Sequence, residues 1–359
     1  MKISTKELNK ILTDPEEAAK FGNLVYIYEN DLEILRKKKG EEFIYLRENK
    51  PLTDEKIINR IESLVIPPAW QNVKIAAIEN AHLQVIGEDL KKRKQYRYHE
   101  LWTKIRNCTK FYKMSAFGKM LPSLREKVDN DLSLKGMPQE KVLALIVRLM
   151  DETHIRIGNE YYAKKNNSYG LSTMRTRHLK TVDTKMKFHF VGKRGKEHRV
   201  TIKNKRLKRL VLQSKEIPGW ELFQYYDESG NHHSVDSGMV NEYIHDLSGD
   251  DFSAKDFRTW AATTIFFSSL YQSGIETKES KNKKNILKAY DSAAEGLGNT
   301  RNVCRKYYVH PEVVKQYETG EIDSYFKGLN RRKEQHYFSK EESAVLDIIN
   351  GYQIVIDEL

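Results

Sequence analysis

The chain has 359 residues, of which 39% are hydrophobic and 31% charged, a composition typical of a folded protein rather than a disordered one. No stretch reaches the about 18 to 20 apolar residues that a membrane span needs. Lysine and arginine total 62 against 50 acidic residues, a net charge of +12, which favours polyanionic partners because each neutralised phosphate releases counterions.

The cysteine content and the first residues bear on location. Only Cys108 and Cys304 are present, so we expect neither a disulfide framework nor a zinc cluster, and no metal site. The opening segment, MKISTKELNKILTD, has no apolar run of the kind found in secretion signals. We therefore expect a cytoplasmic protein (nucleoid-associated if bacterial) without a membrane contact.

The first hundred residues contain several short β-type runs. Four of them have alternating or branched and aromatic side chains, namely NLVYIYEN, EEFIYLREN, VKIAAIEN and AHLQVIGED, with ENAH as a turn between the last two. A helical pattern occurs in LTDEKIINRIESL. We therefore predict a small β-rich N-terminal domain over residues 1–107.

A further strand is predicted in KKRKQYRYH, residues 91–99. Because strand side chains alternate, Tyr96 and Tyr98 would share one face, directly after four basic residues. Aromatic rings presented with cations suit contact with a sugar-phosphate backbone and adjacent bases. The pattern fits a half-buried edge strand with ordinary tyrosines equally well, and the residues alone leave both interpretations open.

Around residues 105–115 the pattern becomes mostly helical, as in PQEKVLALIVRLMDE, and we expect a larger second domain over 108–359. A β interruption at 186–202, MKFHFVGKRGKEHRVTI, predicts a hairpin closed by a glycine-bounded turn. The basic run KESKNKK (278–284) is interpreted as a solvated loop. Near the C-terminus, FSKEESAVLDIINGY predicts a helical extension that packs on this domain.

Two tyrosines stand side by side in GNTRNVCRKYYVHP. A helix is expected here as far as about His310, since Pro311 prevents its continuation. By helical spacing, Tyr307 shares an apolar face with Val303 and Cys304 and would pack inward, whereas Tyr308 would lie along a basic face. We therefore predict that Tyr308 is the tyrosine presented to an anion.

A phenol has a pKa near 10 and attacks at neutral pH only with help. Attack on a phosphodiester also needs cations for the developing charge and a proton donor for the leaving oxygen. Arg156 lies where a helical pattern breaks in HIRIGNEYY, and Lys193 lies at the tip of the FVGKRGKEH turn. A Ser-x-x-Asp capping box opens the helix of SAKDFRTWAATTIFF and sets Lys255 and Arg258 on one face. Each of these side chains, taken alone, is also consistent with an ordinary solvated cation.

Taken in order, these segments resemble the type IB DNA topoisomerases in their poxviral and bacterial form. IPPAW and KQYRYH are similar to the family's N-terminal domain, and RIGNEYY, YGLSTMRTRHL, FVGK, KDFRTW and GNTRNVCRKYYVHP to its catalytic domain. The resemblance implies an α+β fold with a small β-rich N-terminal domain and a larger, mainly helical catalytic domain. That domain would contain a small antiparallel sheet (the tyrosine recombinase/topoisomerase IB catalytic fold). A monomer would clamp double-stranded DNA between the two domains.

The resemblance also implies a role for individual residues. Arg156 and Arg258 would hold the scissile phosphate, and Lys193 would protonate the departing 5′ oxygen. Tyr308 would attack the phosphorus and form a 3′-phosphotyrosyl link. Some members have histidine in place of Asn299; because an amide cannot shuttle protons near neutral pH, Asn299 would donate a hydrogen bond to a phosphate oxygen.

Further positions follow from the same resemblance. Lys255 matches a lysine thought to assist departure of the leaving group. Thr263 stands where the poxviral pattern has asparagine, and we leave it out of the predicted site. The predicted DNA contacts are Gln95, Tyr96, Tyr98 and Tyr162, together with Lys94 and Arg97 of the basic strand.

The implied activity is relaxation of positive and negative supercoils by transient cleavage of one strand, without ATP, metal or cofactor. Consistent with that expectation, the sequence has no GxxxxGK[ST] phosphate loop and no carboxylate cluster spaced for Mg²⁺. Two alternatives stay open. A tyrosine recombinase shares the fold and the arginine, lysine and tyrosine set, but usually has histidine where this chain has Lys255, and a helical N-terminal domain. A non-catalytic DNA-binding relative could also have kept the fold.

Overall fold

The structure is a computed structural model that describes residues 5–182, 185–249 and 252–353. The chain divides into two compact units, one that contains the chain up to Tyr112 together with Gln353, and the other spanning Lys113–Tyr352. Helix α4 (Glu100–Asp131) crosses this division. Among the described residues, no helix combines the length and the apolar character that a membrane crossing requires.

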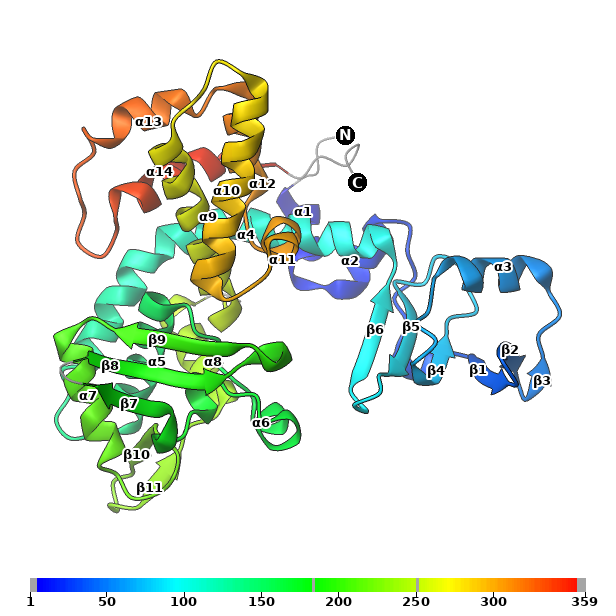
Figure 1. Cartoon of the computed structure of the whole chain (residues 1–359), viewed down its shortest axis with the longest axis horizontal. Coiled ribbons are helices and arrows are strands. Elements are labelled where there is room, and N and C mark those ends of the chain that lie inside the picture. The colour runs from blue at the N-terminus through cyan, green and yellow to red at the C-terminus, as the bar shows by residue number, and fades with distance from the viewer. Residues whose placement is uncertain (1–4, 183–184, 250–251, 354–359) are drawn as a thin grey trace. The chain divides into compact units, whose positions relative to one another are not determined.

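The first unit is built on a six-stranded antiparallel sheet. Helix α3 (Glu55–Ser63) packs on it, with Ile61 of the helix in one apolar cluster with Ile34 and Val85 of the sheet. Two short helices, α1 (Thr5–Thr13) and α2 (Pro15–Phe21), precede the sheet. In spatial order the strands are β3 (Lys50–Pro51), β2 (Glu42–Arg47), β1 (Ile34–Lys39), β4 (Gln71–Ile75), β5 (Leu83–Glu88) and β6 (Lys94–Tyr98) (Figure 1).

Most of the strand predictions in this unit are confirmed, since β2, β5 and β6 lie within predicted runs and β4 overlaps the start of another. The predicted strand in NLVYIYEN is wrong. This segment contains only an isolated bridge at Val25 and a 3₁₀ turn over Glu29–Asp31. The physical reason is tertiary packing: Leu24 and Tyr26 join a cluster with Trp102 of α4, so the segment follows a helix surface instead of a sheet edge.

Helix α9 (Ala254–Ser273) is central to the second unit. Its buried face carries Phe266, Phe267 and Leu270, and it packs against α10 (Glu279–Leu297), which lies beside it in Figure 1. The predicted capping box is confirmed, because the backbone N and the Oγ of Ser253 donate to Asp256 at 2.8 and 3.0 Å. The other helices are α5 (Gln139–Thr153), α6 (Glu160–Asn166), α7 (Lys205–Lys215), α8 (Ser237–Ser248), α11 (Arg301–Tyr307), α12 (Pro311–Thr319), α13 (Asp323–Leu329) and α14 (Lys340–Ile349).

Two small antiparallel sheets complete the second unit. The larger consists of β7 (Leu179–Val182), β8 (Lys185–Val191) and β9 (Glu197–Ile202), and the smaller of β10 (Gln224–Tyr226) and β11 (His232–Ser234). The predicted hairpin is therefore confirmed, and a 3₁₀ turn over Lys193–Gly195 joins β8 to β9. A β-rich first unit and a mainly helical second unit with small sheets confirm the predicted α+β class.

The interpretation of KESKNKK as a solvated loop is wrong, because these residues form the first turns of α10. Lys283 pairs with Glu279 one turn earlier at 2.7 Å, a spacing that supports an exposed helix. Ile286 then begins the buried stripe of the same helix. The charges are solvated as predicted, but on a helix surface.

The predicted C-terminal helix is confirmed as α14, which Ser339 caps. Its Glu342 accepts hydrogen bonds from Arg125 of α4 at 2.8 Å and from the indole of Trp260 on α9 at 2.9 Å. Arg125 also pairs with Asp151 of α5 at 2.7 Å. This buried, fully paired network joins four helices of the second unit, and one of them, α5, leads into the segment that carries Arg156.

Candidate active site

Arg258 joins three segments of the second unit. Its side chain is 4% exposed, and its guanidinium donates to the carbonyl oxygen of His154, just after α5, and to that of Leu297 at the end of α10, the latter at 2.9 Å. Burial, and then the charge of Arg156, lower the pKa of Arg258 to about 10. The group is therefore still a cation at neutral pH and is held by backbone carbonyls, with no carboxylate partner among the described residues.

Arg156 follows the end of α5, where His154 adopts a left-handed conformation with φ of 56°. Close backbone packing fixes the segment that carries it. A Cβ at Gly170 would collide with the carbonyl oxygen of Arg156 and with Gly158, which itself has φ of +103°. The glycines of RIGNEYY and YGLST thus allow the two segments to meet, and Arg156 donates a hydrogen bond to Asn299 Oδ1.

Tyr308 lies over the buried arginine. It follows the last residue of α11 and leaves helical geometry, with φ of −128°, and its ring centroid is 5.6 Å from the guanidinium carbon of Arg258. Burial alone would raise the pKa of Tyr308, but the charges of Arg258, Arg156 and Lys193 outweigh burial and lower that pKa below its ordinary value. Three cations from separate elements therefore favour the phenolate.

The predicted orientation of Tyr307 is wrong. Its side chain is 38% exposed, whereas Cys304 is fully buried. Cys304 is the buried residue of this short helix and therefore marks the face that points into the protein. Tyr308 follows one turn later, and its backbone N donates to the carbonyl oxygen of Cys304 at 3.0 Å. The helix also ends at Tyr307, three residues before the predicted end. Tyr308 therefore meets the buried Arg258 instead of the exposed basic face that helical spacing predicted.

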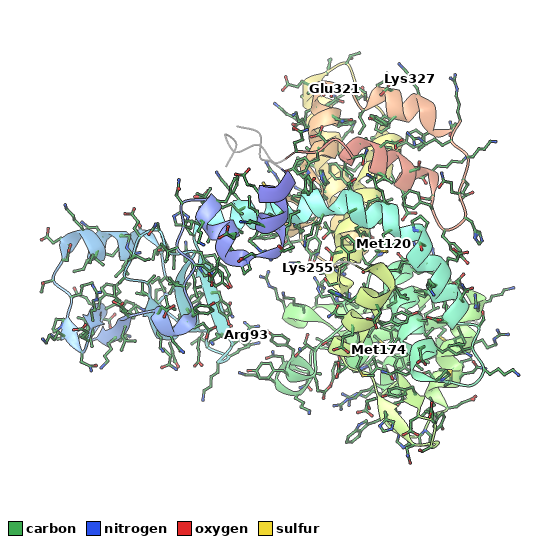
Figure 2. The ribbon with its side chains drawn as sticks, turned by 180° about the vertical axis from the view of Figure 1, so that it is seen from behind. Arg93, Met120, Met174, Lys255, Glu321 and Lys327 are labelled. Carbon is green, nitrogen blue, oxygen red and sulfur yellow. The ribbon has the colours of Figure 1, made fainter. Side chains whose placement is uncertain are left out.

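Lys193 is carried by the turn between β8 and β9. Its side chain is exposed at the turn, yet burial of its charge against the site, followed by the charge of Arg156, lowers the pKa of its ammonium. Lys255, in the first turn of α9 and labelled in Figure 2, is close enough to add to this effect. The structure thus brings together five predicted side chains, with Lys255 at the edge of the group.

A cavity of about 280 Å³ opens between these segments and is lined by Arg156, Lys193 and Arg258, together with Lys196 and His198. In the described part of the chain, Arg258 Nε and Asn299 Nδ2 are buried donors without a hydrogen-bond partner of good geometry. Buried donors are rarely left unpaired. A polar, anionic ligand such as a phosphodiester would satisfy both.

The predicted DNA contacts of the first unit lie on β6. Lys94, Tyr96 and Tyr98 are exposed on one face, and the two tyrosine rings stack with centroids 6.0 Å apart, which confirms the predicted alternation. Glu29 binds this face, pairing with Lys94 and accepting from Tyr96 Oη at 3.0 Å. On the other face, Gln95 donates to Asp89 at 3.0 Å and Arg97 to the carbonyl of Val65 at 3.2 Å.

Tyr162 belongs to the second unit, on α6, where its side chain is exposed and packs edge to face against Tyr161 at 5.4 Å. Like Tyr96 and Tyr98, it therefore presents an aromatic ring to solvent. Within the described ranges, no three histidine, cysteine or carboxylate side chains come together as a metal site would require.

Comparison with known proteins identifies the family. Residues 92–336 match the family described as eukaryotic DNA topoisomerase I, catalytic core, and residues 42–89 match bacterial DNA topoisomerase IB, N-terminal domain. The DNA topoisomerase 1B of Acanthamoeba polyphaga mimivirus is 35% identical over 79% of this chain and 87% of its own length. The chain belongs to the type IB DNA topoisomerase family.

More distant relatives agree with this assignment. The DNA topoisomerase 1 of Rabbit fibroma virus is 24% identical over 65% of the chain and 72% of its own length. The DNA topoisomerase 1B of Vaccinia virus is 22% identical over 64% and 70%. The chain is thus an enzyme of a DNA topoisomerase family, as predicted, and the recombinase alternative is set aside.

Two residues that line this cavity were not predicted from the sequence. His198 and Lys196 line the cavity, but as hairpin residues after a turn they gave no signal that distinguishes them from solvated side chains. Thr263 was left out because it departs from the poxviral pattern. The structure places it at a junction: its hydroxyl accepts from the backbone N of His310 at 3.1 Å and lies 3.3 Å from the carbonyl oxygen of Tyr308.

Replacing Thr263 by valine is expected to slow plasmid relaxation by about 10- to 100-fold, because a small displacement of a reacting group has an effect of this size. Valine keeps the shape of the buried side chain but removes the hydroxyl that accepts from the His310 N–H, and loss of such a buried hydrogen bond costs about 1–3 kcal/mol. Relaxation rate and thermal unfolding would measure both effects. Thr263→Ser keeps the hydroxyl and is the control; wild-type rate and stability in Thr263→Val would refute the role.

Proposed function

We propose that this protein relaxes positive and negative supercoils by cutting one strand of duplex DNA through a 3′-phosphotyrosyl intermediate on Tyr308, and resealing it without ATP, metal or cofactor. The observation that carries the proposal is the lowered pKa of Tyr308 beside Arg258, Arg156 and Lys193. A phenol needs such cations to act as a nucleophile near neutral pH.

In the proposed cleavage step, the phenol loses its proton to solvent and Tyr308 Oη attacks the phosphorus. A phosphorus–oxygen bond forms to the tyrosine while the bond to the 5′ oxygen breaks. Arg156 and Arg258 neutralise the charge on the non-bridging oxygens, and Asn299 donates a hydrogen bond to one of them through its unpaired Nδ2. These donors already lie at the cavity in the free protein, so binding of DNA requires little reorganisation of the site.

The 5′ oxygen leaves with a proton from Lys193. A lysine with its ordinary pKa near 10.4 is a weak proton donor at neutral pH. The lowered pKa of Lys193 brings the ammonium closer to the range of an efficient general acid, and the charge of Lys255 contributes to that lowering. This is a physical basis for the role proposed for Lys255 in expelling the leaving group.

Resealing is the same step in reverse, with the 5′ hydroxyl attacking the phosphotyrosine and returning its proton to Lys193. The phosphodiester bond is exchanged for another ester bond, so no nucleotide hydrolysis is required. Between the two steps, the free 5′ end can rotate about the intact strand and release supercoils of either sign.

We propose that the duplex contacts Lys94, Tyr96 and Tyr98 on β6 and Tyr162 on α6, so that a monomer closes around it. Exposed rings beside a cation suit the sugar-phosphate backbone. In the free protein, Lys94 is paired with Glu29. A DNA phosphate would replace the Glu29 carboxylate in this ion pair. Gln95 and Arg97 would likewise exchange their present partners, Asp89 and Val65, for DNA.

The proposal is tested by relaxation of positively and negatively supercoiled plasmids in EDTA without nucleotide. Both substrates are expected to become fully relaxed under these conditions, because the tyrosine, arginines and lysine supply all of the chemistry. A strict requirement for Mg²⁺ or ATP, or relaxation of only one sign of supercoil, would contradict the proposed mechanism.

A further inference from the structure

His198 lies on β9 of the hairpin that carries Lys193. Its partner across the hairpin is Phe190 of β8, and the two rings stack with centroids 5.1 Å apart and planes 11° from parallel. The imidazole is therefore fixed against the hairpin and lines the cavity together with Arg156 and Arg258.

Two glycines show how closely this ring is enclosed. A Cβ built on Gly192, the residue before Lys193, would lie 2.8 Å from the imidazole of His198. A Cβ on Gly298, the residue before Asn299, would collide with the same imidazole, with Nδ1 3.0 Å away. One ring therefore fills the space between the Lys193 turn and the turn that joins α10 to α11.

The charge of the ring also suits this place. Burial first, and then the charges of Arg156, Lys196 and Arg258, lower the pKa of His198 to about 4. The imidazole is therefore neutral at physiological pH and adds no positive charge to a group of cations that already repel one another. A neutral, flat ring can pack here at a lower electrostatic cost than a lysine or arginine.

Lys193 depends on such support. In the described part of the chain, its ammonium makes no hydrogen bond or ion pair, so its position follows from that of the turn. The turn is joined to the α10–α11 segment by the His198 ring and by Lys196 Nζ, which is 3.5 Å from the carbonyl oxygen of Asn299. Of these two contacts, the ring is the half-buried one and is held by stacking on Phe190, whereas Lys196 is exposed.

We propose that His198 is a positioning residue: its ring docks the Lys193 turn against the Gly298–Asn299 turn and holds the Lys193 ammonium where the leaving oxygen departs. The inference rests on the proposed function, in which Lys193 is the proton donor. It assigns to His198 a mechanical role and no transfer of a proton.

The test is single-turnover cleavage of two duplexes, one with an ordinary scissile phosphate and one with a 5′-bridging phosphorothiolate, whose thiolate leaves without a proton. His198→Ala is expected to slow cleavage of the ordinary duplex by about 10- to 100-fold and to cleave the phosphorothiolate close to the wild-type rate. Adding His198→Ala to Lys193→Ala should cause little further loss, because both changes remove the same step.

Two further variants separate positioning from other effects. His198→Phe keeps a flat neutral ring and is expected to recover much of the rate, which would not occur if a ring nitrogen took part in the chemistry. His189→Ala removes a histidine of the same hairpin that is 40% exposed and paired with Glu197, and should leave the rate unchanged. Thermal unfolding of each variant reports loss of the fold directly.

The possible failures are distinguishable. If Lys193→Ala is rescued by the phosphorothiolate and His198→Ala is not, the positioning role is refuted while the proposed function stands. If Lys193→Ala itself is not rescued, the assignment of the proton donor fails and the inference about His198 fails with it. Equal slowing of His198→Ala on both duplexes would place its effect on phosphate binding or on the tyrosine.

Discussion

Replacement of Tyr308 by phenylalanine is expected to abolish covalent capture of DNA, lowering cleavage by about 10⁴-fold or more, as loss of a nucleophile does in other covalent enzymes. The substitution removes one hydroxyl and keeps the ring that lies over Arg258. Binding of duplex DNA should therefore persist with the same dependence on salt, because that dependence counts neutralised phosphates. Denaturing electrophoresis of protein mixed with labelled duplex measures capture, and a filter-binding titration measures affinity.

Tyr307→Phe is the matched control, since it removes the same hydroxyl from the neighbouring residue. The side chain of Tyr307 is exposed, and the ammonium of Lys306, the residue before it, lies 5.4 Å from the centroid of its ring. This variant should retain most of its activity. A covalent adduct in Tyr308→Phe, or an inactive Tyr307→Phe, would show that the wrong tyrosine has been assigned. Intact capture in both variants would show that neither hydroxyl is the nucleophile, and binding without capture in the wild type would favour a non-catalytic relative.

The two tyrosines illustrate what helical spacing can and cannot predict. Spacing placed Tyr307 and Tyr308 on different faces, but it treated Val303 and Cys304 as one apolar stripe and so reversed the direction of burial. The buried direction is fixed by Cys304, which packs below the chain as it leaves the helix at Tyr308. Where a helix ends, and what the next residue meets, depends on segments far away in the sequence.

Local signals in the sequence were sufficient for local structure. The capping box of α9, the β8–β9 hairpin and the alternation of Tyr96 and Tyr98 each depend on neighbours within a few residues, and each was predicted correctly. The NLVYIYEN segment is the counterexample, because its β-type side chains are used to pack against Trp102 of α4. Propensity sets a preference that tertiary packing can override.

The site itself depends on contacts that no local pattern contains. Arg156 reaches Asn299 over 143 positions of sequence, and Arg258 reaches the carbonyl of Leu297 over 39. Family resemblance could identify these residues because relatives with the same motifs share the fold that brings them together. It could not predict that Arg258 is buried, or that the His198 ring packs against Gly192 and Gly298. Both are properties of three-dimensional packing.

Lys193→Ala is expected to slow cleavage of an ordinary duplex by about 10²–10⁴-fold, the range that general acid catalysis contributes. The wild-type rate on that duplex should also fall as the pH rises through the pKa of Lys193, which burial and then Arg156 hold below the ordinary lysine value. The rate falls with rising pH because only the protonated amine of Lys193 can donate a proton to the leaving oxygen. Tyr308 acts in the opposite direction, since rising pH produces more phenolate.

The two effects can be separated with the 5′-bridging phosphorothiolate, which needs no proton to leave. On this duplex the alkaline fall in rate should disappear, and the profile should rise with pH as Tyr308 ionises. Lys193→Ala should give the same profile on both duplexes, because the group that loses its proton is absent. Lys196→Ala, on the same turn and also lining the cavity, is the control and should keep the alkaline fall. A wild-type rate that keeps rising with pH on the ordinary duplex would mean that the leaving oxygen obtains its proton from another donor.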